Sequence, residues 1–96
     1  MNVEVKKENG KVIFTPDSRV DSTTSQDLEK VINETEICNG EKISLDFSSV
    51  DYISSMGIRV LAAAYKKYGS LEIENAGGAV KEILKLSGLL NIFDVR

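Results

Sequence analysis

The chain has 96 residues, a formal net charge of −3, 42% hydrophobic and 28% charged residues, and no histidine. This length corresponds to one domain, which we expect to span residues 1–96, and the composition is typical of a globular protein rather than a disordered one. An acidic domain repels a phosphate backbone, so nucleic-acid binding is not expected. The lack of histidine excludes Ser-His-Asp and Cys-His catalysis and every zinc site that needs histidine.

The cellular location can be predicted from the single cysteine and from the lack of long apolar runs. Cys38 cannot form an internal disulfide or a Cys-x-x-Cys redox pair, and a lone thiol fits a reducing compartment. Residues 1–11 alternate and carry charges, unlike a signal peptide. No apolar run approaches the ~20 residues that cross a bilayer. We therefore expect a cytoplasmic protein without a membrane partner.

The first 15 residues have the pattern of a β-hairpin. Val3 and Val5 alternate with charged residues, and a second apolar stretch follows at residues 11–15. Between them, Asn9-Gly10 supplies the two positive-φ residues of a type I′ turn. Pro16 lacks an amide donor and is expected to end the second strand.

The rest of the chain alternates helical and extended patterns. A capping box at Thr23-x-x-Gln26 and the apolar spacing that follows predict a helix that ends near Glu36. Two further helices are expected, one from Ser54-Ser55 to Gly69 and one from Val80 to Gly88. The apolar stripe of the middle helix is predicted to comprise Ile58, Leu61, Ala62 and Tyr65.

Strand patterns separate these helices at residues 42–47, 71–74 and 91–95. The polar–apolar alternation in 42–47 indicates that only one face of the sheet is well covered. Strands that alternate with helices imply right-handed crossovers and a parallel arrangement. The predicted fold class is therefore α/β, with a mostly parallel sheet, an N-terminal β-hairpin and about three helices.

Three polar loops follow predicted strands, at residues 21–25, 46–55 and 75–78. In open α/β sheets this edge is where ligands and partners bind. The central loop leads into Ser54-Ser55-Met56-Gly57, at the start of the middle helix. Free N–H groups there accept an anion, including a phosphate carried by one of the serines. The alternative is that a serine only caps the helix.

Gly57 is unusual because glycine in a helix costs about 1 kcal/mol relative to alanine. A missing Cβ allows either a partner or a neighbouring element to approach closely. Both interpretations remain open from the residues alone.

Residues 45–61 resemble the signature of STAS domains, the anti-sigma factor antagonist family. That signature reads leucine-aspartate-x-serine, a short gap, then aromatic-isoleucine-aspartate-serine-serine-or-threonine-glycine-leucine. Residues 19–21 are similar to the segment before the family's first helix. Residues 84–93 resemble its closing leucine-x-leucine-threonine-glycine-leucine and final strand. The resemblance covers nearly the whole chain and implies a STAS domain at 1–96.

The resemblance also implies roles for particular residues. The family's phosphorylated serine lies two positions before the glycine, which corresponds to Ser55. Asp21 and Asp46 match carboxylates near that serine, with helix capping and strand-end solvation as alternatives. Core packing is the alternative for Ile58. The implied partner-binding residues are Asp21, Asp46, Ser54, Met56, Gly57 and Ile58.

The chain departs from the family pattern in three places. Ser54 stands where the family has aspartate and is a competing phosphate acceptor. Met56 replaces a small hydroxyl residue and adds apolar area to the contact surface. Many members continue into another helix where this chain ends, which leaves open whether the protein is a monomer or a weak homodimer.

The function implied by the resemblance is partner switching in bacterial signalling and transcription regulation. The protein would bind a GHKL-type serine kinase that acts as an anti-sigma factor, and so release the sigma factor. The kinase would phosphorylate Ser55, and a serine phosphatase would reverse the modification. The chain itself would not be an enzyme and would need no cofactor or metal.

Two alternatives belong to other classes. One is a non-switching STAS interaction or scaffold module, because a fold does not fix a function. The other is an enzyme or small-ligand domain. It would need a base beside a serine nucleophile, and Lys66 and Lys67 are expected at the far end of the helix that Ser55 begins.

Overall fold

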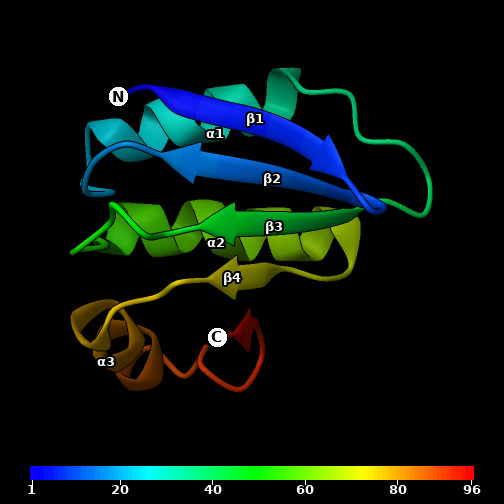
Figure 1. Cartoon of the computed structure of the whole chain (residues 1–96). Coiled ribbons are helices and arrows are strands. Elements are labelled where there is room, and N and C mark those ends of the chain that lie inside the picture. Colours follow the sequence, from blue (N-terminus) through cyan, green and yellow to red (C-terminus); the bar gives the residue numbers. More distant parts are fainter.

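The computed structural model describes all 96 residues, which form a five-stranded sheet and three helices (Figure 1). The predicted order of a hairpin followed by alternating helices and strands is confirmed. In chain order, the elements are β1 (Val3–Glu8), β2 (Lys11–Pro16), α1 (Thr24–Glu34), β3 (Lys42–Asp46), α2 (Ser55–Tyr68), β4 (Glu72–Glu74), α3 (Gly78–Leu86) and β5 (Asp94–Val95).

The sheet is mostly parallel, as predicted. Its strands lie in the order β1-β2-β3-β4-β5. Only β1 and β2 are antiparallel, and every other neighbouring pair is parallel. The hairpin turn is the one that the sequence predicts, since Asn9 has a φ of 51° and Gly10 a φ of 76°. Pro16 ends β2, beyond the residues that pair with β3, so the ladder loses no donor.

The last strand is shorter than the predicted 91–95. The backbone N–H groups of Ile92 and Phe93 donate to the carbonyl of Leu89, which keeps residues 89–93 in a turn. Strand β5 therefore contains only Asp94 and Val95, which pair with β4.

The N-terminus of α1 is capped differently from the prediction. Thr23 makes no side-chain capping bond, so the Thr23-x-x-Gln26 capping box is wrong. Instead, Asp21 Oδ1 accepts from the backbone N–H groups of Thr23 and Thr24, both at 2.9 Å, and Thr24 Oγ1 accepts from the Asp21 N–H at 2.8 Å. A carboxylate is the stronger acceptor for these amides, so the reciprocal pair forms two residues earlier in the chain.

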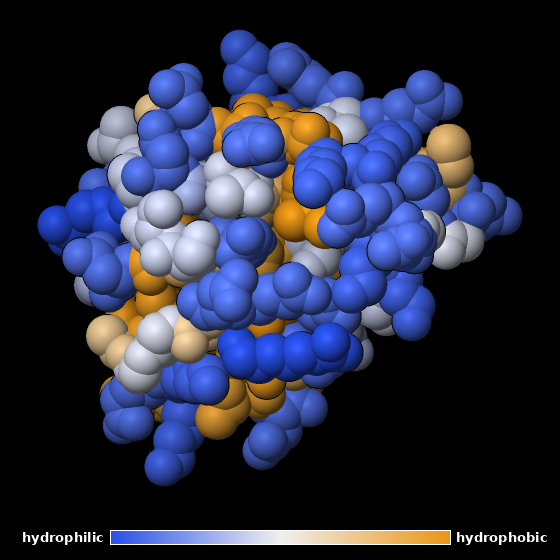
Figure 2. All heavy atoms as spheres, viewed as in Figure 1, coloured by the Kyte–Doolittle hydropathy of each residue, from blue (hydrophilic) through white to orange (hydrophobic).

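Two helices cover one face of the sheet: α1 lies behind β1 and β2, and α2 lies behind β3 (Figure 1). Both helices contribute buried residues to the hydrophobic core. Alternate residues of the strands point into this core, and Phe14, Leu45 and Ile73 are fully buried there. The opposite face is turned to the viewer in Figure 2 and is largely hydrophilic. The prediction that one face is well covered is therefore confirmed.

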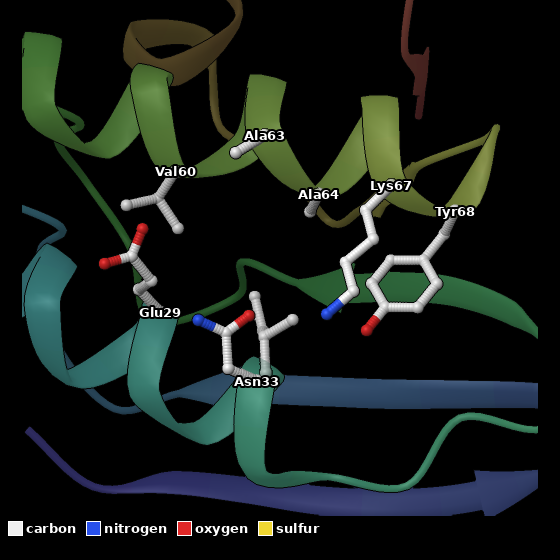
Figure 3. Close-up of a pocket in the computed structure, with 8 residues that line it drawn as sticks. Glu29, Asn33, Val60, Ala63, Ala64, Lys67 and Tyr68 are labelled. Atoms are coloured by element: carbon white, nitrogen blue, oxygen red, sulfur yellow. The ribbon is translucent and has the colours of Figure 1, made fainter.

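Helix α2 buries a wider stripe than predicted, because it packs against both the sheet and α1. Leu61 is fully buried as expected, but Val60 and Ala64 are buried as well. Figure 3 shows the shallow groove where these two residues face Glu29 and Asn33 of α1. Ile58, Ala62 and Tyr65 are only half-buried.

Glycines end α2 and α3 as predicted. Gly69 caps α2 with a φ of 80°, and Gly88 has a φ of 75° just after α3. None of the three helices combines the length and apolarity that a membrane span requires.

Candidate functional site

The three polar loops that follow strands meet at one edge of the sheet. The backbone N–H of Val20 donates to the Tyr52 carbonyl at 2.9 Å, and the N–H of Ser54 donates to the Val20 carbonyl at 2.8 Å. This short parallel bridge joins the segment before α1 to the central loop. On the other side, Asn75 Nδ2 donates to Asp46 Oδ1 at 3.0 Å. The predicted convergence of these loops is therefore confirmed.

Gly57 allows the first turn of α2 to rest directly on this bridge. A Cβ at position 57 would lie 2.8 Å from Cγ1 of both Val20 and Ile53, and 3.1 Å from the Val20 carbonyl oxygen. Gly57 is buried, so the close approach is made by a neighbouring element of the same chain. Gly57 thus supports the first turn of α2 from the buried side, while Met56 and Ile58 on either side of it are partly exposed.

The two adjacent serines have different roles at this turn. Ser54 is the N-cap of α2, and its Oγ accepts from the backbone N–H of Gly57 at 3.2 Å. Ser54 is half-buried, whereas Ser55 is exposed and its hydroxyl makes no hydrogen bond within the protein. The capping interpretation therefore applies to Ser54, and the Ser55 hydroxyl is free to react.

The backbone around Ser55 is suited to negative charge. The N–H groups of Ser55 and Met56 have no acceptor within the protein, and the first bond of the helix runs from the Ile58 N–H to the Ser54 carbonyl at 2.9 Å. These free donors add to the positive end of the helix dipole. An anion attached to Ser55 Oγ would lie beside them without disturbing a hydrogen bond that already exists.

The two predicted carboxylates both make structural hydrogen bonds at this edge. Hydrogen bonds from Thr24 and Thr23 lower the pKa of Asp21, which confirms its capping role. The amide of Asn75, together with the backbone N–H of Ser48, lowers the pKa of Asp46 and fixes the end of β3 against the loop after β4. Both carboxylates are therefore held in the charged form near neutral pH.

Met56 and Ile58 present different amounts of side chain on the first turn. Both are half-buried, but only Ile58 packs against the hydrophobic core. Core packing thus accounts for part of the Ile58 side chain. Met56 remains as an apolar group on the surface beside Ser55.

Three residues near the site were missed by the predictions from sequence. Tyr52 is 39% exposed, and the guanidinium of Arg19 lies 5.0 Å from the centre of its ring. The Val20–Ile53 bridge brings these two side chains together. Arg59 is exposed on the next turn of α2. Helical spacing from Ser55 could have identified Arg59, whereas the stacked pair depends on a bridge that the sequence does not reveal.

The structure contains no group of three or more histidine, cysteine, aspartate or glutamate side chains placed to hold a metal ion. The site is thus an exposed hydroxyl at a helix start, flanked by apolar and cationic side chains.

Sequence and structure comparisons place the chain among proteins of one family. The STAS domain family profile matches residues 2–96. The anti-sigma-F factor antagonist RsfB of Mycobacterium tuberculosis is 27% identical over 96 residues, covering 97% of this chain and 79% of RsfB. BtrV of Bordetella bronchiseptica is 31% identical over 100 residues, covering 99% of this chain and 85% of BtrV. The chain belongs to the STAS domain family.

Solved structures share the fold of this chain. An anti-sigma factor antagonist from Mycobacterium paratuberculosis superimposes with a TM-score of 0.85 at 25% identity, covering 98% of this chain and 83% of that one. The anti-sigma factor antagonist SpoIIAA in its unphosphorylated form gives 0.80 at 12% identity, covering 99% and 88%. The Bacillus cell fate determinant SpoIIAA in its phosphorylated form gives 0.69 at 15% identity, covering 99% and 91%.

Proposed function

We propose that this protein is an anti-sigma factor antagonist whose binding is switched off by phosphorylation of Ser55. Its partner would be a GHKL-type serine kinase that acts as the anti-sigma factor, and a serine phosphatase would restore the binding form in the cytoplasm. Relatives that carry the antagonist name support the general role. The single observation that favours Ser55 is its exposed, unbonded hydroxyl next to the engaged hydroxyl of Ser54.

The proposed docking surface consists of Tyr52, Ser55, Met56 and the outer part of Ile58. Tyr52 is exposed and Met56 is half-buried, so both place apolar area around the exposed Ser55 hydroxyl. Such an arrangement suits the core of a protein interface. Asp21 and Asp46 would act indirectly, because their carboxylates hold the loops that support this surface.

Phosphorylation would change this surface without unfolding the domain. The kinase would transfer the γ-phosphoryl group of ATP to Ser55 Oγ, with release of ADP and of the hydroxyl proton. The phosphate adds about −1.5 to −2 charges at neutral pH, which the free N–H groups at the start of α2 tolerate. In a complex, the same group would have to lose its water, and an unpaired buried charge costs several kcal/mol. Binding would be lost while the fold remains.

Mapping of the phosphorylated residue tests the proposal. The purified protein is incubated with its cognate kinase, ATP and magnesium, and the products are examined by mass spectrometry. We expect one added phosphoryl group, located on Ser55, and none on Ser55→Ala. Ser54→Ala is the matched control, because it removes the neighbouring hydroxyl and its capping bond but leaves the acceptor in place.

Two results would contradict the assignment. Transfer of the phosphoryl group to Ser54, Ser48 or Ser49 in place of Ser55 would contradict the assignment of the phosphorylated residue. No transfer at all would contradict regulation by phosphorylation. A partner that binds equally well with and without ATP would favour a non-switching scaffold module instead.

A further inference from the structure

Arg59 is placed to respond to a charge on Ser55. The two residues are four positions apart in α2 and are therefore neighbours on the helix surface, about 6 Å apart along the axis. Side chains on a helix lean towards its N-terminus, which directs a long side chain at position 59 back over the first turn. Both residues are exposed.

Arg59 also differs from the other two arginines of the chain. Arg19 lies over the ring of Tyr52 and 3.9 Å from Asp21 Oδ2, while Arg96 pairs with Asp94 at 2.9 Å and with Glu72 at 3.3 Å. Arg59 makes no ion pair and no side-chain hydrogen bond. Its guanidinium is therefore a cation without a partner in the protein, on the same helix face as the exposed Ser55.

We propose that Arg59 is the internal partner of the phosphate on Ser55, and that this pair, together with the free N–H groups of Ser55 and Met56, holds the phosphorylated first turn of α2 in one arrangement. The inference rests on the proposed phosphorylation of Ser55. A guanidinium can donate two parallel hydrogen bonds to a phosphate, which a lysine ammonium cannot do. An arginine at position 59 is thus well suited to bind a phosphate on Ser55, four residues earlier in the helix.

The pair has a consequence for the switch. In the unmodified protein, Arg59 is free to meet an acidic group of a partner at the edge of the docking surface. After phosphorylation, the same guanidinium is occupied by the phosphate of its own chain. One modification therefore adds negative charge and also withdraws a positive one from the surface.

The test uses protein that carries phosphoserine at position 55, inserted during translation so that no kinase is needed. The second pKa of the phosphate, about 6 for a free phosphoserine, is measured by phosphorus NMR titration at about 0.1 M salt. Pairing with Arg59 stabilises the dianion, so Arg59→Ala is expected to raise this pKa by about 0.3–0.6 unit. Arg59→Lys is expected to give an intermediate value.

Lys66→Ala is the matched control. It removes one positive charge from the same helix, about 16 Å from Ser55 along the axis. That distance exceeds the Debye length of about 10 Å at 0.1 M salt. We expect it to leave the phosphate pKa nearly unchanged. Equal pKa values for the Arg59→Ala and Lys66→Ala proteins would overturn the inference. Because no kinase takes part, this result is distinct from a failure of kinase to modify Ser55.

Discussion

Two polar regions of the molecule differ in how fully their side chains are paired. On the open face of the sheet, Lys11 Nζ donates to Glu72 Oε1 at 2.7 Å, and the buried Ser44 hydroxyl donates to the same oxygen at 3.1 Å. Arg96 contacts the other oxygen of Glu72 at 3.3 Å. At the first two turns of α2, by contrast, the Ser55 hydroxyl and the Arg59 guanidinium have no partner.

This difference separates structural polar groups from candidate functional ones. The pairing with Lys11 lowers the pKa of Glu72 to about 2, so its carboxylate stays charged within a closed network. The hydrogen bonds of a group in such a network are already made within the protein and stabilise the fold. An exposed group without a partner is available for another molecule. Substitutions in the first region should therefore change stability, and substitutions in the second should change binding.

The largest effect on stability is expected at the contact beneath the first turn. Gly57→Ala places a methyl group 2.8 Å from Val20 and Ile53 side-chain atoms, and such overpacking costs about 1–3 kcal/mol. The free energy of unfolding is measured with urea. Gly78→Ala is the control, because a Cβ there meets nothing within 4 Å. Equal stability of the two variants would show that α2 does not rest on the bridge.

The next largest effect concerns the cap of α1. Thr24→Val removes the oxygen that accepts from the Asp21 N–H and donates to the Arg19 carbonyl, and should cost about 1 kcal/mol. Thr23→Val should cost much less, because the Thr23 side chain makes no capping bond. Thermal unfolding of both variants distinguishes the caps. A larger loss of thermal stability for Thr23→Val than for Thr24→Val would support the capping box predicted from sequence.

A smaller effect is expected from acid. The folded-state pKa of Glu72 lies at about 2, below its ordinary value of 4.5, so its contribution to stability is complete above about pH 4.5 and disappears as the pH falls towards 2. Glu72→Gln should make the stability less dependent on pH in this range. Glu82→Gln serves as the control, because Glu82 is exposed. Identical dependence of stability on pH for the unmodified protein, Glu72→Gln and Glu82→Gln would mean that the open-face network does not contribute to stability.

The smallest effects on stability are expected at the exposed side chains of the first two turns of α2. Ser55→Ala and Arg59→Ala remove exposed side chains without partners, so each should change the free energy of unfolding by less than about 0.5 kcal/mol. Chemical denaturation of each variant tests this. A loss similar to that of Gly57→Ala would mean that these side chains belong to the fold and would remove the contrast between the two regions.

Local chemistry explains which parts of the fold were predictable. The hairpin turn needs two positive-φ residues, and Asn9-Gly10 provides them. The ends of α2 follow from a serine cap and from Gly69. At α1, Asp21 and Thr23 were both able to cap the helix, and the carboxylate of Asp21, the stronger acceptor, binds the amides of Thr23 and Thr24.

Contacts between distant segments explain what was not predictable. The Lys11–Glu72 pair joins residues 61 positions apart, and no periodicity indicates such a pair. The same holds for the burial of Val60 and Ala64, which depends on where α1 lies. At the site, the resemblance indicated Ser55, while the structure adds that Ser54 is engaged as a cap and that Gly57 is enclosed by Val20 and Ile53.

The most direct test of the switch is the affinity of the protein for its anti-sigma partner, measured by calorimetry with unmodified protein, Ser55→Ala, Ser55→Asp and Ser55-phosphorylated protein. We expect Ser55→Ala to bind like the unmodified protein, Ser55→Asp about tenfold more weakly, and the phosphorylated form at least 100-fold more weakly. All four should unfold at similar temperatures. Equal affinity of the unmodified and phosphorylated proteins would contradict a charge switch at Ser55.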